Sequence, residues 1–159
     1  MNKALNHYLN TIPKNRTKEE LTYAYGDGRY QYCNGFSVII TTEEPDYTPM
    51  GVRDRAPSLN KLDYPVGIPT LAELNAEIKR RGITKSQKLT DKRLYKIADW
   101  AKFDIFYIRD IVSVLGYCHG YWDREIVTCK DGKKVAINGL RFVSDKGEAL
   151  LLPVSTKTP

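Results

Sequence analysis

The sequence predicts an α+β fold, because helical and strand patterns occupy separate stretches of its 159 residues. In residues 1–42 one helical pattern precedes about three alternating strand patterns, and residues 102–154 repeat that order with about four. Between them, residues 43–101 combine a proline-rich stretch with mostly helical, basic sequence. A chain of this length suffices for one sizeable core, so we expect a single domain over residues 1–159.

The first half opens with apolar side chains at helical spacing, and Pro13 ends that helix. These side chains are Ala4, Leu5, Tyr8, Leu9 and Ile12. Three short strands are expected at residues 21–25, 29–33 and 36–41. The turn residues Gly26-Asp27-Gly28 and Asn34-Gly35 separate them.

The middle of the chain begins with a stretch in which prolines oppose regular structure. Residues 43–69 contain Pro45, Pro49, Pro57, Pro65 and Pro69, each of which fixes φ and lacks an amide donor. A loop of this length is either functional or lies over the surface.

Two helices are predicted after this loop. Thr70 and Glu73 form a capping-box pattern at the start of a helix that Gly82 ends, with Leu71, Leu74 and Ile78 facing inward. A second helix is predicted from Thr90 to Ala101. Its inward positions are Leu94, Ile97, Ala98 and Ala101.

The second half has equally clear boundaries. Asp104 is the expected N-cap of a helix over 105–115, and Gly116 follows it. Strands are expected at residues 124–129 and 133–138 around Lys130-Asp131-Gly132. Two further strands, at residues 140–144 and 148–154, flank Asp145-Lys146-Gly147.

The net charge of +6 comes from one stretch, residues 79–96, here named the basic segment. It contains eight basic residues and one acid, Asp91, whereas the rest of the chain has 17 basic and 18 acidic residues. The eight are Lys79, Arg80, Arg81, Lys85, Lys88, Lys92, Arg93 and Lys96. We predict that they bind nucleic acid or a nucleic-acid-processing protein; a merely solvated face is the alternative.

Two aromatic residues near the basic segment, Tyr95 and Trp100, are candidates to stack on bases, although a core position for Trp100 is equally compatible with its sequence context. Recognition of a particular base sequence is not predicted, because phosphate contacts confer affinity and register but little sequence information.

Three segments resemble half-modules of the DNA sliding-clamp superfamily, and especially its short clamp-like proteins from phages and mobile elements of Gram-positive bacteria. They are the strand-turn-strand at residues 30–39, the helix at 103–111 with Leu115-Gly116, and the closing strand at 147–154. The resemblance implies a clamp-like domain of two helix-plus-antiparallel-sheet halves, with the helical basic segment in an insertion. A ring around DNA is not expected, because it needs more such modules and because Arg109 is the only cation of the 105–115 helix.

Metal and catalytic sites are weakly indicated. Cys118, His119 and Cys129, with Cys33 as a fourth candidate, are zinc-type ligands, but the paired C-x₂-C spacing of structural zinc is absent. We therefore expect buried free thiols and no cofactor, with a zinc-stabilised interaction module as an alternative. Adjacent residues of a strand point to opposite faces, which disfavours a Cys118–His119 catalytic pair, so the chain is not expected to be an enzyme.

The basic segment predicts a non-enzymatic protein that acts in nucleic-acid transactions, and the resemblance implies that it is an accessory protein of a phage or mobile element. The alternative is an anti-CRISPR inhibitor that binds a CRISPR nuclease and blocks guide or target DNA loading. No apolar stretch approaches the roughly 20 residues of a membrane span, and the N-terminus lacks a signal-peptide core. With three unpaired cysteines, this predicts a cytoplasmic protein without a membrane partner, and a homodimer is left open.

Overall fold

The computed structural model confirms the α+β class. It describes residues 1–54, 64–98, 101–128, 132 and 134–154, and the side chains of residues 98, 123–128 and 134–138 are also left out of the description. The helices are α1 (Lys3–Leu9), α2 (Leu71–Arg81) and α3 (Ile105–Leu115), with a 3₁₀ turn, η1, at Asp91–Arg93. The strands are β1 (Thr22–Tyr25), β2 (Tyr30–Cys33), β3 (Ser37–Thr41), β4 (Gly51–Arg53), β5 (Pro65–Val66), β6 (Leu94–Ala98), β7 (Ala101–Asp104), β8 (His119–Thr128), β9 (Lys134–Ser144) and β10 (Gly147–Leu151).

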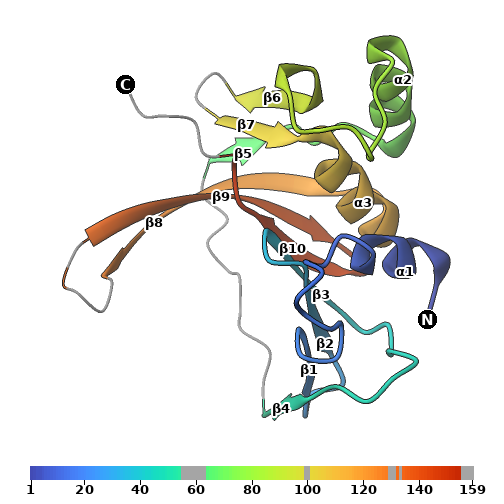
Figure 1. Ribbon diagram of the computed structural model, residues 1–159. Coiled ribbons are helices and arrows are strands. Elements are labelled where there is room, and N and C mark those ends of the chain that lie inside the picture. Colours follow the sequence, from blue (N-terminus) through green and yellow to red (C-terminus); the bar gives the residue numbers. More distant parts are fainter. Residues whose placement is uncertain (55–63, 99–100, 129–131, 133, 155–159) are drawn as a thin grey trace.

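One large sheet contains strands from both ends of the sequence, in the order β4-β1-β2-β3-β10-β9-β8-β5. Its central seam is the antiparallel pairing of β3 with β10, which joins residues 37–41 to residues 147–151. The sheet is mixed, because β4 runs parallel to β1. The strands β6 and β7 form a separate antiparallel pair beside α2 (Figure 1).

The core lies between the large sheet and the helices α1 and α3, which lie side by side on one of its faces (Figure 1). A row of cross-strand neighbours shows why: Tyr32 pairs with Ile39, Ile39 with Ala149, and Ala149 with Phe142. All four side chains are fully buried. Since alternate residues of a strand share a face, this row fixes which face of each strand receives the helices.

The first-half predictions are confirmed, with one shorter helix. Helix α1 ends at Leu9, so Ile12 lies beyond it. The Asn34-Gly35 bend forms because Gly35 adopts φ 93° and the Asn34 side chain accepts hydrogen bonds from the amides of Phe36 and Ser37.

Two predictions for the middle region need correction. Residues 43–69 were expected to lack regular structure, yet β4 and β5 pair with the edges of the large sheet. Pro65 is tolerated because β5 is an edge strand, where an amide donor is not needed on the outer side. Pro57 lies outside the described residues.

The predicted helix from Thr90 to Ala101 is wrong. Thr90 precedes the 3₁₀ turn η1, and the chain then continues into β6 and, after residues 99–100, into β7. The hairpin pairs Leu94 with Asp104 and Tyr95 with Phe103, so Tyr95 shares a face with a fully buried ring. Apolar residues here satisfy a two-residue repeat as well as a helical one, and the pairing with β7 decides between them.

The caps of α2 and α3 are as predicted. The hydroxyl of Thr70 accepts from the amide of Glu73, whose carboxylate accepts from the amide of Thr70, and the Asp104 carboxylate accepts from the amide of Phe106. Leu74 is fully buried, but Leu71 is 38% exposed, contrary to the prediction.

The lengths of the C-terminal strands differ from the prediction: β8 begins at His119 rather than at residue 124, and β10 ends at Leu151 rather than at residue 154. The strand patterns at 133–138 and 140–144 belong to one continuous strand, β9, which pairs with β8 from Thr128 to His119. Within the part of the chain that is described, no helix has both the length and the apolar character needed to cross a bilayer.

Candidate functional site

The basic segment runs through four consecutive structural pieces: the last turn of α2, the loop over residues 82–90, the turn η1 and the strand β6 (Figure 1). The structure divides its eight cationic side chains into two groups. The side chains of Arg81, Lys85 and Arg93 are buried or half-buried and bond to groups within the fold. Those of Lys79, Arg80, Lys88, Lys92 and Lys96 are exposed, although Arg80 is also paired with Glu77.

Arg81 ties the end of α2 to the chain that follows the loop. Its Nε lies 2.7 Å from a carboxylate oxygen of Glu77, and its Nη1 donates to the carbonyls of Lys92 (3.0 Å) and Leu94 (2.8 Å). One guanidinium therefore closes the 82–90 loop at its base, because its several donors suit two partners at once.

Arg93 is the most deeply placed cation of the basic segment, with 7% of its surface exposed. Its Nη2 donates to Asp104 at 2.6 Å, and its Nη1 donates to the carbonyls of Lys85 (3.2 Å) and Gln87 (2.6 Å). The guanidinium also lies over the ring of Phe106 at 4.9 Å. Arg93 thus fixes the loop to the start of α3.

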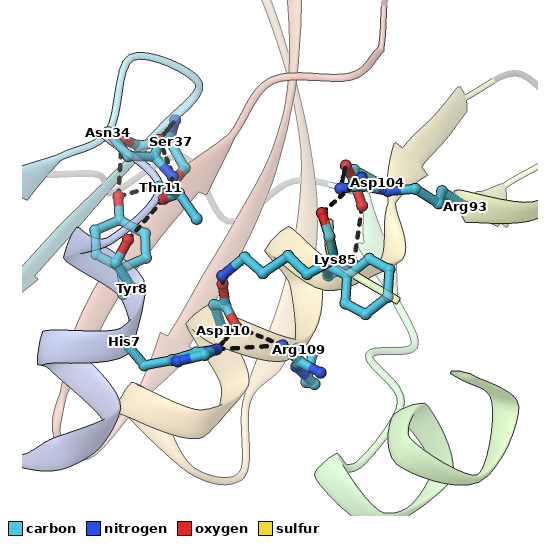
Figure 2. A network of polar contacts seen from close by, with 11 residues as sticks. His7, Tyr8, Thr11, Asn34, Ser37, Lys85, Arg93, Asp104, Arg109 and Asp110 are labelled. Atoms are coloured by element: carbon cyan, nitrogen blue, oxygen red, sulfur yellow. Dashed lines mark hydrogen bonds and ion pairs between the residues drawn. The ribbon is translucent and has the colours of Figure 1, made fainter. Parts of the chain in front are cut away.

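Lys85 makes the third connection, to the buried carboxylate of Asp110 on α3 (Figure 2). The same carboxylate receives Arg109 at 3.3 Å and lies 3.7 Å from Nε2 of His7 on α1. Because the side chain of Asp110 is only 1% exposed, these partners compensate a charge that water cannot solvate. The network joins α1, α3 and the loop over residues 82–90, which we name the basic loop.

Four of the five exposed cations belong to one neighbourhood. Lys79 and Arg80 occupy the last turn of α2, and the Arg81 bonds hold Lys92 beside that turn. Lys88 and Lys92 line a cavity of about 450 Å³ together with Asp91, Gly82 and other residues of the loop. We name Lys79, Arg80, Lys88 and Lys92 the basic surface.

The fifth cation, Lys96, lies apart from the basic surface on the hairpin. It is directly opposite Lys102 of β7, and both side chains are exposed. Tyr95 faces the core side, so the neighbouring Lys96 projects to the other face of the pair. Lys102 was missed because it lies outside the basic segment, and a strand register over 94–104 would have revealed it.

Internal carboxylates offset part of the positive charge. Glu77 contacts both Arg80 and Arg81, and hydrogen bonds from these two guanidinium groups lower the pKa of Glu77 to about 2. Asp104 and Asp110 compensate Arg93 and Lys85. Three of the seven excess charges counted from the sequence are therefore balanced within the fold.

Tyr95, the aromatic candidate that the structure describes, does not extend the basic surface. Tyr95 is half-buried beneath Arg81, with the guanidinium 5.9 Å from its ring centre, and burial raises the pKa of its hydroxyl. Trp100 lies outside the described residues. The structure therefore does not show the ring of Tyr95 exposed for stacking on a base.

The candidate zinc ligands are placed only in part. Cys118 is a buried free thiol whose pKa burial raises to about 11, while His119 is exposed and packs edge-on against Tyr117. Cys129 lies outside the described residues. Among the described side chains, no group of three or more His, Cys, Asp or Glu residues is placed to hold a metal ion.

Comparison of the chain with protein-family models, with curated proteins and with solved structures finds no significant match. The resemblance to sliding-clamp half-modules therefore remains a prediction from the three sequence segments.

Proposed function

We propose that this chain is a non-enzymatic nucleic-acid-binding protein that contacts the phosphate backbone through the basic surface. The observation that supports this most directly is that the basic segment contains both cations that anchor the loop and cations that are exposed. Three cations anchor the loop internally, and the four of the basic surface are exposed around it, with Arg80 paired to Glu77.

Anchoring matters because a charged loop held in one conformation loses less conformational entropy on binding than a free one. The loop is fastened at its base by Arg81, at its centre by Lys85 and before β6 by Arg93. Several exposed cations around one loop suit the repeated charge of a phosphate backbone, and phosphate contacts carry little sequence information. We therefore propose binding with little sequence preference.

The cellular setting follows the sequence prediction. We propose that the protein works in the cytoplasm as an accessory factor of a phage or mobile element, which the resemblance to clamp-like proteins supports. The two free thiols among the described cysteines, Cys33 and Cys118, are compatible with a reducing compartment.

The test is fluorescence anisotropy with a short labelled DNA duplex, its single strand and the corresponding RNA, across a salt series. A site with four phosphate contacts gives a slope of log K against log salt of about −3 to −4. The double variant Lys88→Glu/Lys92→Glu should weaken binding for all sequences and reduce the magnitude of this slope by about 2.

The matched control is Lys3→Glu/Lys14→Glu, which makes the same charge change at two exposed lysines outside the basic segment. This control should retain most of the affinity. Equal losses in both variants would mean that net charge alone drives binding. No binding by the unmodified protein would contradict the proposal and favour the inhibitor hypothesis, in which the target is a nuclease. Binding would then be tested by co-elution of the protein with that nuclease.

A further inference from the structure

A second, separate cavity lies on the inner side of the basic loop, between that loop and the helices α1 and α3. It measures about 460 Å³. Its walls come from His7 of α1 and the two residues that follow the end of that helix, Asn10 and Thr11, and from Lys85, Ser86, Arg93 and Tyr107 of the loop, η1 and α3. Figure 2 shows His7, Thr11, Lys85 and Arg93 around this region.

The lining of this cavity favours an anion. Lys85 and Arg93 contribute two cations, and Thr11, Ser86 and Tyr107 contribute hydroxyl groups. Among the described residues that line it, there is no Asp or Glu. A phosphate group needs several donors and positive charge around its oxygens, and this set provides both.

The charges next to the cavity do not balance. Arg93, Lys85 and Arg109 meet only two carboxylates, Asp104 and Asp110, so one positive charge is in excess even when His7 is neutral. Both carboxylates are almost fully buried and already paired, so the excess charge lies on the partly exposed side chains of Lys85 and Arg109. A bound anion would complete the balance.

Arg93 supplies an independent indication. Its Nε is buried and has no hydrogen-bond partner among the described atoms, whereas Nη1 donates two hydrogen bonds and Nη2 donates one. Buried polar atoms are nearly always paired in folded proteins. An oxygen atom that reached this nitrogen would supply the missing acceptor.

We propose that this cavity binds a phosphate monoester, either of a small phosphorylated molecule or at the 5′ end of a nucleic-acid strand. The two sources present the same chemistry, a terminal phosphate with two negative charges. The small-molecule case stands independently of the proposed nucleic-acid function, whereas the strand-end case would add to it.

The experiment is an NMR titration of the ¹⁵N-labelled protein with inorganic phosphate, AMP and adenosine, at constant ionic strength set by sodium chloride. Phosphate and AMP should cause saturable shifts at the amides around Lys85 and Ser86, and adenosine should cause none. Absence of saturable shifts with both phosphate compounds would overturn the proposal.

Two variants place a carboxylate in the cavity from opposite walls, Ser86→Glu from the loop and Asn10→Asp from the residue that follows α1. Each should weaken phosphate binding by about tenfold or more, because like charges repel strongly at short range. The matched control is Gln87→Glu, with the same charge change one residue away; Gln87 lines the other cavity and not this one. Unchanged binding in both cavity variants would overturn the assignment of the site.

The two sources are separated by comparing a 5′-phosphorylated strand with its 5′-hydroxyl form. A preference for the phosphorylated strand that Ser86→Glu removes identifies the strand end, and equal affinity for both forms identifies the small ligand. The Lys88→Glu/Lys92→Glu protein should still bind inorganic phosphate. This distinguishes failure of the basic surface from failure of the phosphate cavity.

Discussion

The replacement Arg93→Met tests whether buried ion pairing holds the basic loop in place. Methionine fills a similar volume but removes the charge and every hydrogen bond of the guanidinium. Asp104, which is 4% exposed, would then carry a buried charge without its ion-pair partner, and the carbonyls of Lys85 and Gln87 would lose a donor. Breaking one side of such a buried pair costs about 3–5 kcal/mol.

That magnitude is large relative to the total stability of a domain, which is typically about 5–15 kcal/mol. Urea unfolding followed by circular dichroism should show it as a drop in the midpoint of about 2 M, for an m-value of roughly 2 kcal/mol per molar. The exposed residue Lys88 offers a matched control on the same loop. Lys88→Met should change stability by no more than about 0.5 kcal/mol.

A double-mutant cycle with Asp104→Asn isolates the pair. Asparagine keeps the cap on α3, because its side-chain oxygen still accepts from the amide of Phe106, but it removes the buried charge. We expect Arg93→Met/Asp104→Asn to recover much of the stability lost in Arg93→Met. A loss below about 1 kcal/mol in the single variant, or no recovery in the double variant, would refute a stabilising role for this ion pair.

Three further outcomes are expected. The pKa of Glu77 falls from near 4.5 to about 2 in the fold, so its ionised form stabilises the protein above pH 4.5 and this contribution is lost as the pH falls towards 2. The replacement Glu77→Gln should therefore reduce the dependence of the free energy of unfolding on pH over that range. With the other two cysteines changed to serine, Cys118 in the folded protein should react with iodoacetamide at pH 8 about 100-fold more slowly than in the unfolded protein. Its rate in the folded protein should rise about tenfold for each unit of increasing pH up to 11. Gly147→Ala should lower the melting temperature, because φ is 153° and a Cβ would lie 2.2 Å from the carbonyl oxygen of Ile40; an unchanged melting temperature would contradict this close packing.

Much of the fold could be predicted because local signals and tertiary packing agree in most of the chain. The capping box at Thr70, the N-cap Asp104 and the Asn34-Gly35 bend are formed by residues a few positions apart, so their physical basis is visible in the sequence. The closing strand β10 alternates half-buried and buried residues, which makes its period of two easy to detect, whereas β3 buries Ile39 and Ile40 in two separate clusters.

The failures have a tertiary cause. The 94–98 strand satisfies helical spacing as well, and only its pairing with β7 and the Arg93–Asp104 bond select the extended form. Similarly, β4 exists because β1 offers it an edge, and residues 43–69 alone contain no such signal.

The basic segment itself was visible in the sequence, but its division into anchoring and exposed cations was not. Lys85 finds its carboxylate 25 positions away on α3, so a count of neighbouring acids cannot detect the compensation. Only the pairing of Glu77 with Arg80 and Arg81, at helical spacings of three and four, was accessible from local sequence.

The seam between β3 and β10 has a consequence for synthesis on the ribosome. The Thr41 hydroxyl bonds to the carbonyl of Lys146, 105 positions later, so the middle of the sheet stays open until the last strand emerges. At a translation rate of about 5–20 residues per second this delay is on the order of 5–20 s. During that time one edge of the nascent β3 is unpaired, and we expect ribosome-bound chains that stop before β10 to recruit chaperones or to aggregate.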